Sequence, residues 1–255
     1  MAAATNSKPP VGKPIIFFHG DKGGVGKSFA CSTFIDTLVS HKIAAAVVDG
    51  DPRNPDVERM FGEELRVKTA NLRSQQGWMD LTDFLVENAD LPIIVSLPAG
   101  VGGDFAREAA DFFEMAGLLK RPVSMFWVIN LLPDSINLLN QTLDVVGTKL
   151  HTKAVVKNLF FGEEDQFTRW DNSDVRKRFE AIGGKTVCLQ KMHDRVVDKL
   201  FADAAKVAPF SLAVVPINES KTSSFKLTPS ENMELIKWLR KTDAVFAPLH
   251  VELGV

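Results

Sequence analysis

A glycine-rich loop places the strongest constraint on what this chain can fold into. The loop reads Lys22-Gly23-Gly24-Val25-Gly26-Lys27-Ser28 and lies between an apolar run, residues 14–19, and an amphipathic segment, residues 27–40. Its glycines let the backbone turn tightly and approach an anion without a Cβ clash. Free N–H groups at a helix N-terminus attract phosphate. The sequence therefore predicts a strand–loop–helix unit that binds nucleotide phosphates, with Lys27 on the β- and γ-phosphates and the Ser28 hydroxyl on Mg²⁺.

The loop matches one form of the phosphate-loop pattern completely and falls one position short of another. The strict eight-residue Walker A pattern requires glycine where this chain has Asp21. The variant K-G-G-x-G-K-[S/T] matches in full, and a chance match has a probability on the order of 10⁻⁵ to 10⁻⁴. The competing interpretation is a glycine-rich turn with solvated lysines. We expect ATP and Mg²⁺ as cofactors, with the loop from Gly23 to Ser28 and the following Phe29 in contact with the nucleotide.

Short apolar runs alternate with amphipathic segments along the rest of the chain. Further strands are predicted at residues 43–48, 93–97, 123–129, 154–160 and 186–189. Further helices are predicted at residues 104–119, 134–150, 173–182, 194–207 and 230–241. Near-continuous apolar strands separated by helices indicate a parallel sheet covered on both faces. We expect a three-layer α/β/α sandwich with a mostly parallel, twisted sheet, formed by one domain at residues 14–255 after a flexible tail at residues 1–13.

Two carboxylates follow the second predicted strand. Asp49 and Asp51 end the run Val47-Val48-Asp49-Gly50-Asp51-Pro52. The carboxyl ends of strands form the ligand edge of an α/β sheet. At that edge, the two side chains could orient water on Mg²⁺ or position an attacking water. The alternative is that they cap the next helix.

Lys22 makes the loop resemble the deviant Walker A motif of the ParA/MinD ATPases. The resemblance implies a nucleotide-dependent homodimer in which Lys22 reaches the partner's phosphates. It also implies that Asp51 positions the attacking water and that Asp49 supports the magnesium shell. The sequence Asp-Gly-Asp-Pro-Arg-Asn-Pro-Asp from residue 49, together with the Ser96 departure described next, is most similar to the ParA-like proteins of plasmid stabilisation and conjugative transfer, the StbB and TraL type.

The chain departs from that family at its third motif. Ser96-Leu97-Pro98-Ala99-Gly100 resembles the family's Asp-x-Pro-x-Gly, whose aspartate binds a magnesium-ligated water. The Ser96 hydroxyl can hydrogen-bond that water but adds no negative charge, so we expect slow hydrolysis. Asn158 resembles the base-contacting asparagine of the family, whereas Gln190 departs from the pattern of the base-covering loop. The absence of an Asn/Thr-Lys-x-Asp motif favours ATP over GTP.

Composition excludes several other classes of protein. The formal net charge is −2 over 255 residues, so DNA binding would require a local basic patch. Two such groups are candidates: Arg176, Lys177 and Arg178, and Lys237, Arg240 and Lys241. Two cysteines without metal-like spacing suit a reducing cytoplasm. The sequence contains no apolar run of membrane-spanning length, and residues 244–255 lack the basic face of a membrane-binding helix, so we expect no stable membrane association.

These observations lead to one principal hypothesis and two alternatives. The principal hypothesis is a weak, magnesium-dependent, partner-stimulated ATPase that acts as a dimeric switch in plasmid or DNA partition, stabilisation or conjugative transfer, with DNA or a DNA-binding protein as partner. The first alternative is an ATP-binding interaction module with little hydrolysis, which Ser96 favours. The second is a metabolic or assembly enzyme on the same fold, which the two cysteines, Cys31 and Cys188, support poorly as a cluster carrier.

Overall fold

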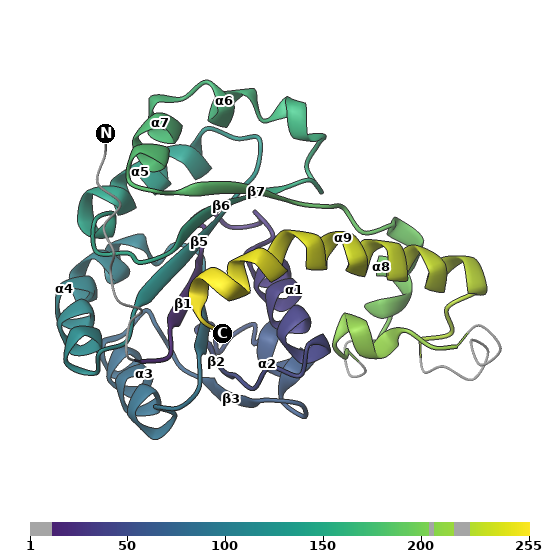
Figure 1. Cartoon of the computed structure of the whole chain (residues 1–255), viewed down its shortest axis with the longest axis horizontal. Coiled ribbons are helices and arrows are strands. Elements are labelled where there is room, and N and C mark those ends of the chain that lie inside the picture. The colour runs from purple at the N-terminus through teal and green to yellow at the C-terminus, as the bar shows by residue number, and fades with distance from the viewer. Residues whose placement is uncertain (1–11, 204–206, 217–224) are drawn as a thin grey trace.

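Seven strands form the central sheet in the order β3-β2-β4-β1-β5-β6-β7. The computed structural model describes residues 12–203, 207–216 and 225–255, so nearly all of the predicted tail at residues 1–13 lies outside the described residues (Figure 1). All recorded strand pairings are parallel. The strands are β1 (Ile15–His19), β2 (Ala46–Asp49), β3 (Arg66–Thr69), β4 (Ile93–Ser96), β5 (Val123–Ile129), β6 (Lys153–Asn158) and β7 (Lys185–Leu189).

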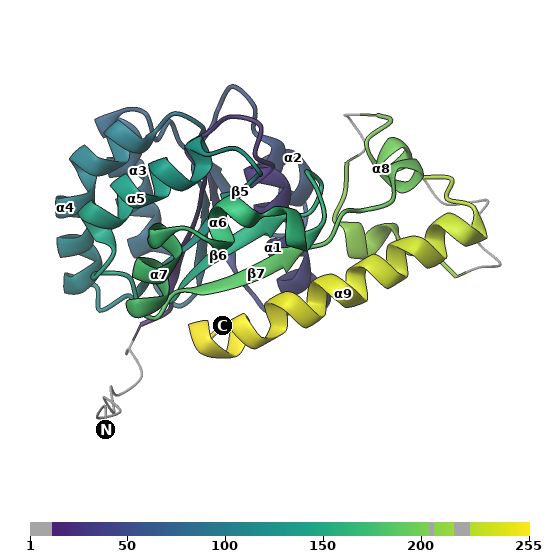
Figure 2. The ribbon, with the colours of Figure 1, turned by 90° about the horizontal axis from the view of Figure 1, so that it is seen from above.

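Helices cover both faces of this sheet, as Figures 1 and 2 show. They are α1 (Lys27–Ser40), α2 (Asp56–Phe61), α3 (Gln75–Glu87), α4 (Gly102–Leu118), α5 (Asp134–Val146), α6 (Thr168–Asp171), α7 (Asp174–Ala181), α8 (Asp194–Leu200) and α9 (Pro229–Leu253), with the short 3₁₀ turns η1 (Glu164–Gln166) and η3 (Phe210–Ala213). The predicted three-layer α/β/α sandwich with a mostly parallel sheet is confirmed.

The central strand β1 shows how the sequence produces two buried layers. Successive side chains of a strand point to opposite faces of the sheet. Phe17 packs with Trp78, Phe105 and Phe112 of the α3–α4 layer, whereas Phe18 packs with Phe34 of α1 on the other face. All five residues of β1 are fully buried. A strand that is buried on both faces consists of a nearly continuous run of apolar residues, so β1 could be predicted from the sequence.

Three elements between β2 and β4 are absent from the sequence prediction. Strand β3 (RVKT) is an edge strand that contains a single apolar residue, Val67, so it gives no apolar run. Helix α2 has only six residues, and α3 carries Gly77 in its first turn. That glycine is required there, because a Cβ would lie 2.0 Å from the Asn71 carbonyl oxygen. Local pattern is weakest where an element is short, polar or contains glycine.

Several predicted boundaries also needed correction. Strand β2 begins at Ala46 rather than at residue 43, β6 ends at Asn158 rather than 160, α5 ends at Val146 before Gly147, and α8 ends at Leu200 rather than at residue 207. The largest difference is α9, which runs to Leu253 instead of ending at residue 241. It starts with a capping box of Thr228 and Glu231 and ends at Gly254, whose φ is +74°.

Burial against α1 explains the length of α9. Phe246, Leu249 and Leu253 continue the apolar stripe of α9 beyond residue 241 and are buried in the same layer as α1. His250 Nε2 lies 3.0 Å from the Thr37 hydroxyl of α1. In the described part of the chain, no helix has both the length and the apolarity needed to cross a bilayer.

Candidate nucleotide-binding site

The carboxyl ends of β1, β2 and β4 bring the predicted site residues to one edge of the sheet. Strand β4 pairs with both β1 and β2, and Ser96 is in register with Asp49 on one side and Phe18 on the other. The glycine-rich loop follows β1 directly and leads into α1. Asp49, Ser96 and the loop are therefore neighbours at the ligand edge of the sheet, as the sequence predicted.

The glycine-rich loop has the backbone geometry of a phosphate cradle. Gly24 and Gly26 have φ values of +76° and +82°, in the left-handed region that favours glycine. A Cβ on Gly26 would lie 2.2 Å from the Asn158 amide nitrogen. Within the described residues, the main-chain N–H groups from Gly23 to Ser28 donate to no protein acceptor. These consecutive N–H groups at the start of α1 are available to an anion.

Lys27 is the buried cation of the site. Its side chain lies in the first turn of α1 and the residue is 8% exposed. Burial lowers the pKa of Lys27, the charges of Asp51 and Asp21 oppose that shift, and the charge of Arg73 adds to it. The ammonium group is thus held in a dehydrated position with only partial compensation by carboxylates. A phosphate group in the adjoining loop would supply the missing negative charge.

Asp49 performs the helix-capping role that the sequence had left as an alternative. Its Oδ2 accepts hydrogen bonds from the N–H groups of Val57 (2.9 Å) and Glu58 (3.2 Å) in the first turn of α2. Its Oδ1 accepts from the N–H of Asp51 at 3.3 Å. Burial raises the pKa of Asp49 to about 6, although these hydrogen bonds lower it. Support of a magnesium shell by this carboxylate stays a prediction.

Asp51 lies partly exposed beyond the end of β2, where Arg73 approaches it. Arg73 Nη1 is 3.4 Å from Asp51 Oδ1, and the Arg73 Nη2 group donates to the Ala99 carbonyl at 2.9 Å. Arg73 thereby joins the loop after β2 to the loop after β4. Sequence reasoning missed this arginine, because it lies between β3 and α3 in a segment that carries no motif.

Asp21 is a second residue of the site whose role the sequence did not reveal. Its carbonyl oxygen accepts from Gly100 N–H, and its Oδ1 accepts from Gly102 N–H, both at 2.8 Å. The side chain that replaces the first Walker A glycine therefore holds the start of α4. The mismatch at this position was the available signal. A Cβ on Gly102 would lie 2.6 Å from Asp21 Oδ2, so glycine is needed where this carboxylate approaches.

Asn158 and Gln190, the residues that the sequence compared with the family's base-contacting positions, both make hydrogen bonds within the chain. Asn158 is 3% exposed, and its amide donates to the Val25 carbonyl at 2.9 Å while its Oδ1 accepts from Phe160 N–H at 3.1 Å. Asn158 therefore holds the backbone of the phosphate loop at Val25. The Gln190 carbonyl accepts from the indole of Trp238 at 2.8 Å. Contact between Asn158 and a base stays a prediction.

Lys22 extends from the loop toward α5. Its Nζ forms a salt bridge of 2.7 Å with Asp134 Oδ2, and the two side chains are 42% and 53% exposed. Both groups therefore remain accessible to a partner molecule. An exposed pair of this kind stabilises the folded chain by only about 0–1 kcal/mol, so Lys22 can leave Asp134 at little cost.

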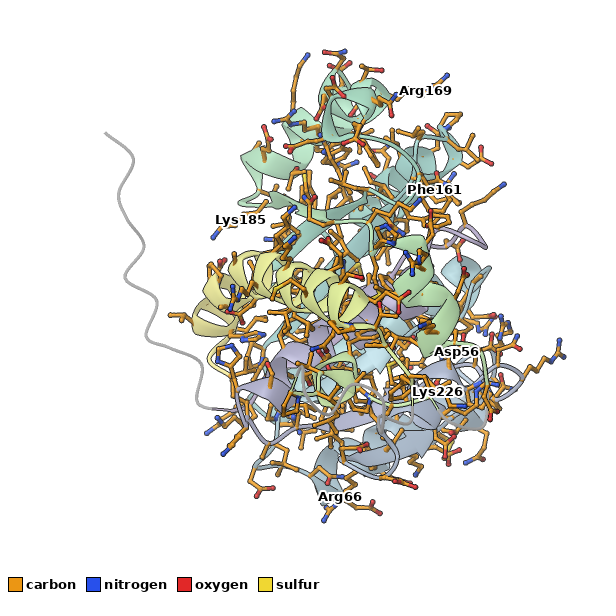
Figure 3. The ribbon with its side chains drawn as sticks, turned by 90° about the vertical axis from the view of Figure 1, so that its right-hand side faces the viewer. Asp56, Arg66, Phe161, Arg169, Lys185 and Lys226 are labelled. Carbon is orange, nitrogen blue, oxygen red and sulfur yellow. The ribbon has the colours of Figure 1, made fainter. Side chains whose placement is uncertain are left out.

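A hollow of about 310 Å³ opens beside Ser28 and Phe29. Its other lining residues come from α1, α2 and the segment around η3: Ser32, Asp56, Arg59, Met60, Phe201, Val207 and Phe210. Asp56 is labelled in Figure 3, which shows the molecule from this side. The ring of Phe29 lies 5.5 Å from that of Phe210 and 5.8 Å from that of Trp238. Phe29 therefore packs against Phe210 and Trp238 beside the hollow.

The oxygen donors of the site fit a magnesium ion that is shared with a nucleotide. Mg²⁺ prefers hard oxygen ligands and is usually held by one or two protein groups together with phosphates and water. Ser28, Asp49 and Ser96, the predicted metal-site residues, carry such oxygens. Among the described residues, no group of three or more His, Cys, Asp or Glu side chains could hold a metal by itself. The donor set therefore fits a nucleotide-bound ion rather than an all-protein metal site.

The chain is similar in part to several known proteins. No protein-family model matches the chain. Protein MobD of Acidithiobacillus ferrooxidans is 29% identical over 206 residues, 80% of this chain and 89% of MobD. The cell division protein MinD of Aquifex aeolicus aligns at 13% identity with a TM-score of 0.49, covering 91% of this chain and 97% of MinD. A nucleotide-binding protein of Archaeoglobus fulgidus in complex with ADP aligns at 15% identity with a TM-score of 0.41. This alignment covers 69% of this chain and 82% of the Archaeoglobus chain.

The close approach at Gly26 generates a prediction. Gly26→Ala should lower nucleotide affinity at least about 10-fold and destabilise the fold by about 1–3 kcal/mol, because the methyl group meets Asn158 and the residue has φ of +82°. Gly103→Ala is the matched control, since a Cβ there meets nothing within 4 Å. Titration with labelled nucleotide and thermal unfolding measure both effects. Equal behaviour of the two variants would contradict the steric account.

Proposed function

We propose that this chain is an ATP-dependent dimeric switch of the ParA type, which hydrolyses ATP slowly with Mg²⁺. The observation that carries the proposal is the phosphate loop, which combines main-chain N–H groups without a protein acceptor among the described residues and the buried Lys27. The role that we infer is in plasmid or DNA partition, stabilisation or conjugative transfer. Lys27→Ala should abolish ATP binding, because the phosphate charge then loses its buried counter-charge.

The arrangement of oxygens supports slow hydrolysis. Magnesium, when bound, would neutralise charge on the β- and γ-phosphates. Ser28 lies in the first turn of α1, where its hydroxyl can ligate that ion, and Asp51 is the partly exposed carboxylate that can position a water. Ser96 is 4% exposed and neighbours Asp49 across the β2–β4 pair. Because Ser96 carries a neutral hydroxyl, this site has one carboxylate fewer than the sites of the family that the sequence resembles.

The rate of hydrolysis provides a test of this account. Ser96→Asp should raise turnover or magnesium affinity about 10- to 100-fold, because a carboxylate is restored near the ion. Without magnesium the same variant should be less stable, since the new charge lies beside buried Asp49. Asp51→Ala should nearly stop hydrolysis and leave ATP binding intact. Phosphate release across a magnesium titration measures these effects.

Ser96→Ala is the control for the loss of the hydroxyl alone. It should bind ATP like the unaltered protein and hydrolyse it no faster. Rapid hydrolysis by the unaltered protein without any partner would contradict the proposal, because it would mean that another residue replaces the missing carboxylate.

Dimerisation is supported by the exposure of Lys22. In the single chain its Nζ rests on Asp134, a partner that it can exchange for the phosphates of a second subunit at little cost. The same loop holds Lys27 inward, so one lysine serves the chain's own nucleotide and the other can reach outward. This division of roles follows from the 8% exposure of Lys27 against the 42% exposure of the Lys22 side chain.

Two substitutions separate dimerisation from binding. Lys22→Ala should bind ATP with nearly unchanged affinity but remain monomeric, because the cross-subunit contact is lost. Asp134→Asn should dimerise at the same or a lower ATP concentration, since it releases Lys22 from its salt bridge. Light scattering with a non-hydrolysable ATP analogue and Mg²⁺ gives the mass of each variant. A stable dimer of the Lys22→Ala variant would contradict the assigned role.

The structure ranks the two basic groups that could bind DNA. On α7, Arg176 pairs with Asp171 (2.9 Å) and Glu180 (2.7 Å). Lys177 and Arg178 likewise pair with Asp174 (2.8 Å) and Asp144 (2.7 Å). On α9, Lys237 pairs with Glu234, whereas Arg240 and Lys241 are exposed and form no salt bridge with the described residues. We infer that the α9 group is the better DNA surface.

Charge reversal tests this ranking. Changing Lys237, Arg240 and Lys241 to Glu should weaken DNA binding by at least about 10-fold and flatten its salt dependence, because fewer counterions are released. The same change of Arg176, Lys177 and Arg178 should have a smaller effect. Binding isotherms with labelled duplex DNA, ATP and Mg²⁺ at several salt concentrations measure both. Unchanged affinity in the α9 variant would remove that surface from consideration.

One alternative function has an observation in its favour. The neutral Ser96 is compatible with an ATP-binding interaction module that hardly hydrolyses its nucleotide. ATP turnover measured with and without DNA distinguishes the two functions, since a module gives no turnover in either condition and a switch is stimulated by its partner.

A further inference from the structure

The segment between β3 and α3 is fixed alongside the candidate site. Ala70 N–H donates to the Asp49 carbonyl at 2.9 Å, and Leu72 N–H donates to the Gly50 carbonyl at 3.3 Å. The Leu72 carbonyl in turn accepts from the indole of Trp78 at 3.0 Å. Because the backbone is held on both sides, Arg73 leaves this segment from a defined position next to the loop after β2.

The guanidinium of Arg73 makes one firm contact and one weak contact. Its Nη2 donates to the Ala99 carbonyl at 2.9 Å, an ordinary hydrogen-bond distance. Its Nη1 lies 3.4 Å from Asp51 Oδ1, beyond the usual range for such a bond. The firm contact is with the loop after β4, and the weak contact is with the carboxylate that faces the phosphate edge. The Arg73 side chain is 33% exposed, so water or a ligand can reach it.

The anchor of Arg73 lies against the phosphate loop, because a Cβ on Gly23 would be 3.9 Å from the Cβ of Ala99, whose carbonyl accepts from Arg73. Asp51 is the one carboxylate with which Arg73 forms a salt bridge in the described part of the chain. A guanidinium presents its N–H groups in a planar fork that matches phosphate oxygens. Arg73 therefore has a donor directed toward the site and an anchor on the loop after β4.

We propose that Arg73 recognises the terminal phosphate of a bound nucleoside triphosphate and transmits its presence to the loop after β4. This inference rests on the proposed function, since it requires a nucleotide in the phosphate loop. The terminal phosphate is a stronger acceptor than the distant Asp51 oxygen, so Nη1 exchanges Asp51 for phosphate. Nη2 keeps its bond to Ala99, and the loop at residues 97–100 follows the guanidinium. A nucleoside diphosphate lacks the γ-phosphate with which Arg73 would form this contact.

The exchange has a consequence for Asp51 and for the loop. Once Arg73 contacts phosphate, Asp51 is free to position a water. The loop after β4 is held on its other side by Asp21, which accepts hydrogen bonds from Gly100 and Gly102 at 2.8 Å. The loop after β4 is thus held by Asp21, which precedes the phosphate loop, and by Arg73, the proposed phosphate sensor. Arg73 is thereby assigned the discrimination between ATP and ADP within one subunit, independently of Lys22.

The affinity ratio for two nucleotides tests the assignment. Arg73→Ala should bind ADP within about twofold of the unaltered protein but lose at least about 10-fold in affinity for a non-hydrolysable ATP analogue, as expected for a lost hydrogen bond to a charged group. Arg73→Lys should fall between the two. Arg53→Ala is the matched control, because it removes an exposed arginine close to the same Asp51, and the Arg53 side chain forms no hydrogen bond or salt bridge with the described residues. An unchanged ratio in Arg73→Ala would overturn the proposal.

Hydrogen exchange tests the transmission step separately. In the unaltered protein, the ATP analogue should slow amide exchange in residues 97–103 more than ADP does. In Arg73→Ala the two nucleotides should give the same exchange, even at saturating concentrations. A difference between ATP analogue and ADP that persists in the variant would show that the loop responds through another residue.

Lys27→Ala separates failure of this inference from failure of the proposed function. If Lys27→Ala abolishes binding of both nucleotides while Arg73→Ala leaves their ratio unchanged, only the role of Arg73 is wrong. If the unaltered protein binds neither nucleotide, the proposed function itself is wrong.

Discussion

The ammonium group of Lys27 is buried at the N-terminus of α1, where two physical effects oppose a positive charge. Burial removes the water that would solvate it, and the positive end of the helix dipole lies beside it. The charges of Asp51 and Asp21 offset part of this cost. An anion in the glycine-rich loop, as proposed for the nucleotide phosphates, would offset the rest of this cost.

The parallel sheet explains how the elements around Lys27 are brought together. Strands β1, β2 and β4 end at the same edge, so the loops that follow them meet there. Each loop is fastened by a polar side chain from elsewhere in the sequence. Asp49 caps α2, Asp21 holds the start of α4, and Asn158 supports the Val25 carbonyl. The site therefore depends on hydrogen bonds between segments that are up to 133 positions apart.

The charge balance at this edge differs from that of the family that the sequence resembles. Ser96 contributes a hydroxyl where a carboxylate is expected, and Asp21 contributes a carboxylate where glycine is expected. The Asp21 carboxylate does not replace the carboxylate missing at Ser96, because Asp21 accepts a hydrogen bond from Gly102 at the start of α4. Arg73 adds a cation near Asp51. The charged groups at this edge therefore include the buried Lys27, the Arg73–Asp51 pair and the Asp21 carboxylate.

The sequence by itself determined the elements whose signal is local. The apolar runs of β1 and β5, the start of α1 and the phosphate loop could all be predicted, because burial on two faces and the conformational freedom of glycine leave a pattern over a few residues. The α/β/α architecture followed from their alternation. The short polar elements β3 and α2 left no such pattern, and the full length of α9 depends on burial against α1.

Only the tertiary structure decided what each polar side chain does. The sequence indicated that Asp49 and Asp51 reach the site, but not that Asp49 caps α2 while Asp51 meets Arg73. Arg73 is 22 residues from Asp51 and carries no motif, and Asp21 joins residues 81 positions away. The physical reason is that glycine-rich loops and buried strands are specified by their own residues, whereas a hydrogen bond or an ion pair exists only when the fold brings donor and acceptor together.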